Sequence, residues 1–261
     1  MDNPSLAIFD FDGTLFDTHA SIAQCISLTF SHYAKTPPPA STIRATISTG
    51  AGLEETFKML HADLAIPSND ANLSDIPNPT NLTVTELSHW ISTYRSLYTS
   101  IGLPLITPFL GADSLLQKLK KKGIPVVVVS NKGIKAVEAV LKNAEMDGLV
   151  EMVLGDMPGV RRKPDPMSYF EIIAPAFEQK GGDEHGDGSD EDEVRHADRL
   201  DPKNVLIIGD TAADIQFARN IGAIACWAKY GYGHKEECEK LGPELVVDSL
   251  EEVQRLVCGT D

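Results

Sequence analysis

The stretch Leu6–Asp17 reads LAIFDFDGTLFD and decides how the rest of the chain is interpreted. It opens with an apolar run of strand length that ends at Asp10, and Asp12 follows two residues later, before a glycine. Side chains two residues apart in an extended segment point the same way, so Asp10 and Asp12 can serve one site. Two ionised carboxylates that close repel each other, and the pKa of one rises unless a cation lies between them. The stretch therefore predicts a strand that delivers two carboxylates to a functional site.

Further along the chain, apolar runs of strand length alternate with helical patterns. The strand-like runs lie at residues 6–10, 125–129, 149–154, 204–208, 224–227 and 244–247. Runs that are apolar throughout are buried on both faces, as in a parallel sheet, and their alternation with helices is typical of a doubly wound α/β fold. Residues 18–108 carry helical patterns alone. We therefore expect a mostly parallel sheet built from residues 1–17 and 109–261, with residues 18–108 as an inserted helical domain.

Composition and charge exclude several classes of protein. The chain has 261 residues, and 42% of them are hydrophobic, which is enough for a sizeable core. Its formal net charge of −15 argues against a nucleic-acid partner. No stretch approaches the ~18 apolar residues of a membrane helix, and residues 1–5 predict no signal peptide. The four cysteines form no C-x-x-C pair, so we expect reduced thiols and a cytoplasmic protein.

Residues 178–201 form an insert within the core that is rich in Gly, Asp and Glu. The insert holds ten acidic and three basic residues, so it carries about half of the net charge. Because it has almost nothing apolar to bury, we expect a flexible, solvated loop.

Polar residues follow two other strand-like runs. Ser130 and Asn131 end the second run, and Asp210 follows the fourth, with Asp214 shortly after it. In open parallel sheets, ligands bind outside the carboxyl ends of the strands, so these residues are expected near Asp10 and Asp12. Several carboxylates in one place suit a hard divalent cation, and Mg²⁺ is the natural choice. The pattern leaves open whether Asp214 is a direct ligand or supports the others.

Other residues at this edge suit a phosphate. Ser130 and Asn131 lie between a strand and the start of a helix, where backbone N–H groups favour an anion. Lys163 can supply a compact positive charge, whereas Arg161 and Arg162 beside it are interpreted as solvated. A metal-bound Asp10 can attack phosphorus and form an aspartyl-phosphate. Asp12 can give a proton to the leaving alcohol and take one from the water that hydrolyses the intermediate.

Four segments together resemble the motifs of the haloacid dehalogenase-like hydrolase superfamily. They begin at Asp10, Ser130, Lys163 and Gly209, and read DFDGTL, SN, KPDP and GDTAAD. The resemblance implies a Rossmann-like core, a helical cap domain at residues 18–108, and a nucleophile at Asp10 with an acid/base at Asp12. It also implies Mg²⁺ held by Asp10, the Asp12 carbonyl and Asp210, with the phosphoryl group held by Ser130 and Lys163. Within the superfamily, the layout is most similar to the phosphoglycolate phosphatase group.

The resemblance predicts a magnesium-dependent phosphatase that acts on a small soluble phosphomonoester, with phosphoglycolate as the leading candidate. Asp12 argues against a dehalogenase, since cleavage of a carbon–halogen bond needs no proton for the leaving group. A sugar-phosphate mutase keeps both aspartates and stays open as an alternative, as does a non-catalytic phosphate-binding protein. In the cap, Arg44 is a candidate for a contact with a substrate carboxylate or phosphate.

Overall fold

The computed structural model describes residues 4–63, 82–180 and 200–259, and within them it contains a six-stranded parallel sheet. The strands lie in the order β5-β4-β1-β6-β7-β8, which places the first strand of the chain at the centre. Their bounds are β1 Leu6–Phe9, β4 Val126–Gly133, β5 Met152–Asp156, β6 Val205–Gly209, β7 Ile224–Ala228 and β8 Leu245–Val247. The predicted doubly wound parallel sheet is therefore confirmed.

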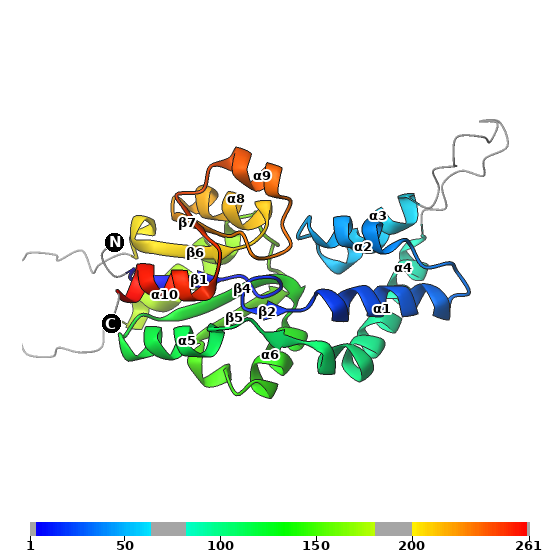
Figure 1. Cartoon of the computed structure of the whole chain (residues 1–261), viewed down its shortest axis with the longest axis horizontal. Coiled ribbons are helices and arrows are strands. Elements are labelled where there is room, and N and C mark those ends of the chain that lie inside the picture. The colour runs from blue at the N-terminus through cyan, green and yellow to red at the C-terminus, as the bar shows by residue number, and fades with distance from the viewer. Residues whose placement is uncertain (1–3, 64–81, 181–199, 260–261) are drawn as a thin grey trace, which may run out of the picture.

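Helices cover both faces of the sheet (Figure 1). Leu6 and Ile8 of β1 pack on one face with α7 (Ala174–Lys180), α8 (Ala212–Ile221) and α9 (Lys235–Leu241). Ala7 and Phe9 pack on the other face with α5 (Ala112–Lys121), α6 (Ile134–Asn143) and α10 (Leu250–Cys258). The alternation along β1 explains its apolar sequence, because a central strand buries both rows of side chains.

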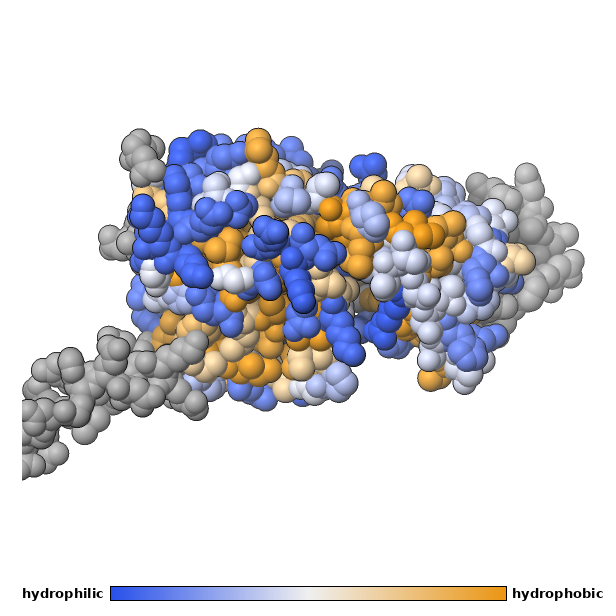
Figure 2. All heavy atoms as spheres, turned by 90° about the horizontal axis from the view of Figure 1, so that it is seen from below, coloured by the Kyte–Doolittle hydropathy of each residue, from blue (hydrophilic) through white to orange (hydrophobic). Residues whose placement is uncertain are grey.

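A separate hydrophobic cluster holds the inserted helices together. The helices are α1 (His19–His32), α2 (Ala40–Ile47), α3 (Leu53–Asp63) and α4 (Val84–Leu97), followed by a π-helical turn at Tyr98–Gly102 and a 3-10 turn at Leu103–Leu105. Trp90 lies near the middle of this cluster, against Phe30, Phe57 and His61. We call residues 18–108 the cap and the rest of the chain the core. The cap extends the molecule along its long axis, and the surface narrows where the two parts meet (Figures 1 and 2).

Two short strands connect the cap to the core. β2 (Phe16–Asp17) pairs antiparallel with β3 (Thr107–Pro108), just where the chain leaves the core and returns to it. The expectation of helical structure alone for residues 18–108 was therefore wrong at its last two residues. Two-residue strands are too short to produce a recognisable alternation in the sequence.

Some sequence-based expectations fall partly or wholly outside what the structure describes. Most of the acidic insert, residues 181–199, lies outside the described residues. All four cysteines are unpaired, which agrees with the expectation of free thiols. Within the described ranges, every helix is too short or too polar to span a bilayer.

Candidate active site

Three neighbouring strands bring the predicted polar residues to one edge of the sheet. Asp10 directly follows β1, Ser130 and Asn131 lie near the end of β4, and Asp210 directly follows β6. The strands are parallel and adjacent, so residues far apart in sequence meet at their carboxyl ends. A cavity of about 920 Å³ opens at this edge, and the predicted residues that line it are Asp10, Asp12, Ser130, Asn131, Lys163 and Asp210.

Lys163 lies between two carboxylates at the base of the site. Its Nζ donates to Oδ1 of Asp10 and to Oδ1 of Asp214, each at 2.6 Å, and all three side chains are at least nine-tenths buried. Burial alone would lower the pKa of Lys163, but the charges of Asp10 and Asp214 raise it, so the lysine is a fixed cation. Among the described residues, nothing hydrogen-bonds to Oδ2 of Asp10. One oxygen of Asp10 is thus held and the other remains free to react.

Asp210 is fully buried and is held from several directions. Its Oδ2 accepts a hydrogen bond from the backbone N–H of Tyr232 at 2.7 Å, and its Oδ1 accepts one from Thr14 at 3.3 Å. Gly13, in the DFDGTL segment, has a φ of +82°, and a Cβ there would lie 2.3 Å from Oδ2 of Asp210. The glycine of that motif therefore permits both the turn and the close approach of Asp210.

Asp214 supports its neighbours through both carboxylate oxygens. Oδ1 accepts from Lys163, while Oδ2 accepts from the backbone N–H of Thr211 at 2.9 Å and from its hydroxyl at 2.7 Å. These contacts form a capping box at the start of α8. Because one oxygen pairs with the Lys163 cation and the other closes the capping box, the geometry favours the supporting role over direct ligation.

Three buried carboxylates lie close enough together to hold a cation. Asp10, Asp210 and Asp214 each offer an oxygen within 4.8 Å of the others. Burial, followed by the charge of Asp214, raises the pKa of Asp10 to about 7 against the opposing effect of Lys163. Burial and the charges of Asp10 and Asp214 also raise the pKa of Asp210. A single lysine does not balance this cluster, and an all-oxygen donor set fits Mg²⁺.

Magnesium is therefore expected to raise the melting temperature more at about pH 8 than at about pH 5.5. The pKa of Asp10 is about 7 in the metal-free protein and 3.8 ordinarily. A carboxyl whose pKa is raised by folding makes the protein less stable as the pH rises between those two values. A divalent ion binds the ionised form and adds about 2.7 kcal/mol at 100 times its Kd. Thermal denaturation in MgCl₂ or EDTA, with NaCl at matched ionic strength as control, measures this effect. An equal magnesium shift at both pH values would contradict the expectation.

Ser130 and Asn131 shape the loop that follows β4. The Ser130 hydroxyl accepts from the backbone N–H of Lys132 at 3.2 Å. Asn131 accepts from the backbone N–H of Lys163 at 2.9 Å and donates to the carbonyl of Gly50 in the cap at 2.9 Å. The side chain of Asn131 thus positions Lys163 and ties it to the cap. Phosphate binding by Ser130 and Asn131 stays a prediction.

Lys132 is a site residue that the sequence interpretation missed. Its Nζ lies 3.0 Å and 3.3 Å from the two oxygens of Asp12, and 4.5 Å from the centre of the Tyr98 ring. Tyr98 begins the π-helical turn after α4, and such turns often occur at functional sites. Lys132 therefore connects the predicted acid/base to the cap. Its position directly after Ser130-Asn131 was the available signal.

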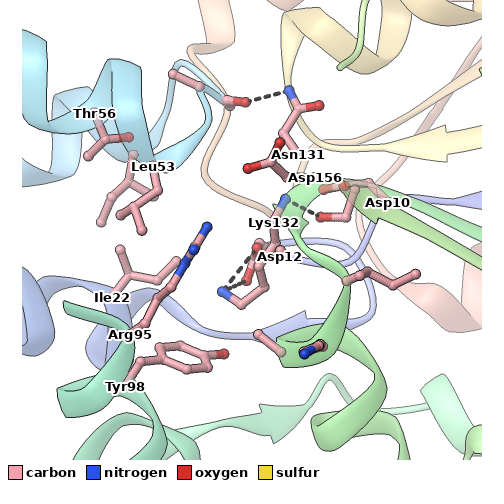
Figure 3. Close-up of a pocket in the computed structure, with 18 of the residues that line it drawn as sticks. Asp10, Asp12, Ile22, Leu53, Thr56, Arg95, Tyr98, Asn131, Lys132 and Asp156 are labelled. Carbon is pink, nitrogen blue, oxygen red and sulfur yellow. Dashed lines mark hydrogen bonds and ion pairs between the residues drawn. The ribbon is translucent and has the colours of Figure 1, made fainter. Parts of the chain in front are cut away.

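The cap closes the cavity with a mostly apolar wall. Figure 3 shows Ile22, Leu53 and Tyr98 around the cavity, together with Arg95, whose guanidinium reaches toward Asp12. Arg44, the predicted substrate contact, is exposed on α2 and is not among the described residues that line the cavity. The spacing of apolar residues in α2 predicts a helix, but it does not indicate which face of that helix meets the core.

Arg162 corrects a second sequence-based interpretation. It donates to both oxygens of Asp156 at 3.0 Å and also pairs with Glu55 of α3. Arg162 is therefore a bridge between core and cap rather than a solvated side chain. The acidic partner from the cap lies more than a hundred residues away in the sequence, so no local pattern reveals the pair.

Comparisons with known proteins agree with this arrangement. A model of the haloacid dehalogenase-like hydrolases matches residues 7–228. A phosphoglycolate phosphatase from Psychrobacter arcticus is 24% identical over 245 residues, which cover 94% of this chain and 92% of that protein. Another from Pseudomonas putida is 23% identical over 247 residues, which cover 95% of this chain and 77% of that protein.

Solved structures share the fold. A predicted phosphoglycolate phosphatase from Haemophilus somnus is 21% identical with a TM-score of 0.76, and the match covers 98% of this chain and 99% of that one. A haloacid dehalogenase-like family hydrolase from Streptococcus pneumoniae is 23% identical with a TM-score of 0.69, over 97% and 98% of the two chains.

Proposed function

Because the chain belongs to the haloacid dehalogenase-like hydrolase family, we propose that it is a magnesium-dependent phosphatase that forms a phosphoryl intermediate on Asp10. The observation that supports the proposal most strongly is the set of contacts made by the two oxygens of the Asp10 side chain. One oxygen is fixed by Lys163 at 2.6 Å, the other has no hydrogen-bond partner among the described residues, and the carboxylate lines the cavity. This is the arrangement that a carboxylate nucleophile needs.

The reaction proceeds in two displacements at phosphorus. Oδ2 of Asp10 attacks phosphorus, the bond to the ester oxygen breaks, and Asp12 gives the leaving alcohol its proton. Asp12 then takes a proton from water, which attacks the same phosphorus, releases inorganic phosphate and restores the Asp10 carboxylate. Before the reaction, Lys132 pairs with both oxygens of Asp12 and holds it at the cavity wall.

Charge on the transferring group is offset by the surrounding cations. Lys163 is a buried, permanently charged neighbour of Asp10 and serves this purpose. Asp10, Asp210 and the backbone carbonyl of Asp12 would hold Mg²⁺, which when bound supplies further stabilisation of negative charge on the phosphoryl oxygens. Asp214 keeps Lys163 in place.

We propose a small phosphomonoester as the substrate, with phosphoglycolate as the leading candidate. The two curated relatives described above carry the name phosphoglycolate phosphatase and align with 94% and 95% of this chain.

The four unpaired cysteines support action in a reducing compartment.

A panel of phosphomonoesters is expected to release inorganic phosphate with MgCl₂ and to stay intact with EDTA. Phosphoglycolate, sugar phosphates and p-nitrophenyl phosphate are incubated with the protein, and both free phosphate and the organic product are measured. If a sugar phosphate is isomerised without release of free phosphate, the protein is a mutase rather than a phosphatase. If the esters bind but none is turned over, the protein is a non-catalytic phosphate-binding protein.

A further inference from the structure

Two of the cations that line the cavity have no carboxylate partner among the described residues, and one of these two belongs to the cap. The described residues that line the cavity include the cations Arg95, Lys132, Lys135 and Lys163. Lys163 lies between Asp10 and Asp214, and Lys132 pairs with Asp12. Within the described part of the chain, Arg95 and Lys135 have no carboxylate partner. Both side chains are exposed, but Lys135 belongs to the core, in the first turn of α6, whereas Arg95 belongs to the cap.

Arg95 is also the single charged group that the described cap residues place on the cavity wall. The larger apolar or aromatic side chains of that wall are Ile22, Ile47, Leu53, Tyr94, Tyr98 and Leu103. The Arg95 side chain is exposed in the free protein, so its guanidinium is accessible to an anionic group that enters the cavity. In Figure 3 its guanidinium reaches from α4 toward the Asp12 end of the cavity.

The backbone of Arg95 lies on a well-anchored helix. Trp90 and Tyr94 of α4 are buried in the cap cluster, so the helix cannot turn its Arg95 side away without exposing them. The carbonyl of Arg95 accepts a hydrogen bond from the Thr99 hydroxyl at 2.9 Å, at the start of the π-helical turn. A binding residue held on a rigid helix is placed more reliably than one on a loop.

From this geometry we infer that Arg95 binds a second anionic group on the substrate, and so selects phosphomonoesters whose alcohol part carries a carboxylate. The inference rests on the proposed phosphatase function. With the phosphate held at Asp10 and Lys163, the rest of the substrate extends toward the cap wall. A planar guanidinium matches a carboxylate with two parallel hydrogen bonds. A phosphomonoester whose alcohol part is uncharged would leave Arg95 without an anionic partner.

A matched pair of esters tests this inference. Phosphoglycolate and the phosphate ester of glycolamide have nearly the same shape but differ by one negative charge. The ratio of their kcat/KM values is measured for the wild type and for Arg95→Met, Lys135→Met and Arg44→Met. In Arg95→Met we expect the preference for phosphoglycolate to fall roughly tenfold or more, mainly through KM. In Arg44→Met and Lys135→Met the ratio is expected to change by less than about twofold.

The possible outcomes separate this inference from the proposed function. An unchanged ratio in Arg95→Met, or its collapse in Lys135→Met or Arg44→Met instead, overturns the role of Arg95 while phosphatase activity stands. If the wild type cleaves neither ester, phosphoglycolate is not its substrate, and if it cleaves no ester of the wider panel, the proposed function fails. Calorimetric binding of both esters to the wild type and to Arg95→Met then decides the role of Arg95. Tighter binding of phosphoglycolate that depends on Arg95 supports the inference, and equal binding overturns it.

Discussion

Asp10→Asn is expected to abolish phosphate release while the protein folds as the wild type does. The change is nearly isosteric but removes the charge with which Oδ2 attacks phosphorus, and no other described carboxylate has this combination of access and support. Loss of a nucleophile typically lowers kcat by on the order of 10⁴-fold or more. Stability is expected to hold without metal, because burial already disfavours the ionised form of Asp10 and raises its pKa to about 7.

Steady-state kinetics and urea denaturation of the same preparation measure the two effects. Asp113→Asn, an exposed change of the same kind in α5, serves as the control and is expected to keep wild-type rates. Acid-quenched wild-type enzyme should also carry one phosphoryl group by mass spectrometry, and Asp10→Asn should carry none. A variant rate within about tenfold of the wild type would end the covalent mechanism.

The sheet could be predicted because its central strands can be recognised from their own residues alone. The strand-like runs of β1, β4 and β6 are apolar before their polar ends, and each indicates burial on both faces without reference to its neighbours. Asp10, Ser130 and Asp210 could then be brought together, because one topological rule places the ends of parallel strands at one edge. The short strands β2 and β3 lack such a pattern, since two residues cannot display an alternation.

Contacts between cap and core could not be predicted in the same way. They depend on which face of each cap helix meets the cavity, and the helical pattern of Arg44 or Arg95 leaves that orientation open. Arg162 depends on Glu55, and Lys132 on both Asp12 and the ring of Tyr98, all of them distant in sequence. These residues connect two separately packed hydrophobic clusters, so neither cluster alone determines their partners.

Lys163→Met is expected to lower both activity and stability by large factors. The lysine pairs with the carboxylate that carries the reacting oxygen, and removing one such group typically costs roughly 10²- to 10³-fold in kcat. The same change leaves Asp10 and Asp214 buried without their shared partner, each having been paired at 2.6 Å. Breaking a buried ion pair from one side costs about 3–5 kcal/mol of unfolding free energy.

The stability loss is expected to be greater at about pH 8 than at about pH 5.5. In the wild type, the positive charge of Lys163 opposes the rise that burial causes in the pKa of Asp10. Without Lys163, this pKa therefore rises further above its ordinary 3.8. At the lower pH Asp10 takes up a proton in the folded protein, which removes its uncompensated charge, and at the higher pH it can do so only at a cost in free energy. Urea denaturation in EDTA at both pH values measures the difference.

Two comparisons distinguish charge from packing. Lys229→Met removes an exposed partner of Asp248 and is expected to cost less than about 1 kcal/mol at either pH. Adding Asp214→Asn to Lys163→Met removes one unpaired charge and is expected to restore part of the lost stability, a coupling that a double-mutant cycle measures. If the double variant is no more stable than Lys163→Met at about pH 8, the lysine matters for packing alone. In that case the description of this site as a cluster of carboxylates balanced by cations is wrong, because charge compensation is what separates these side chains from ordinary buried ones.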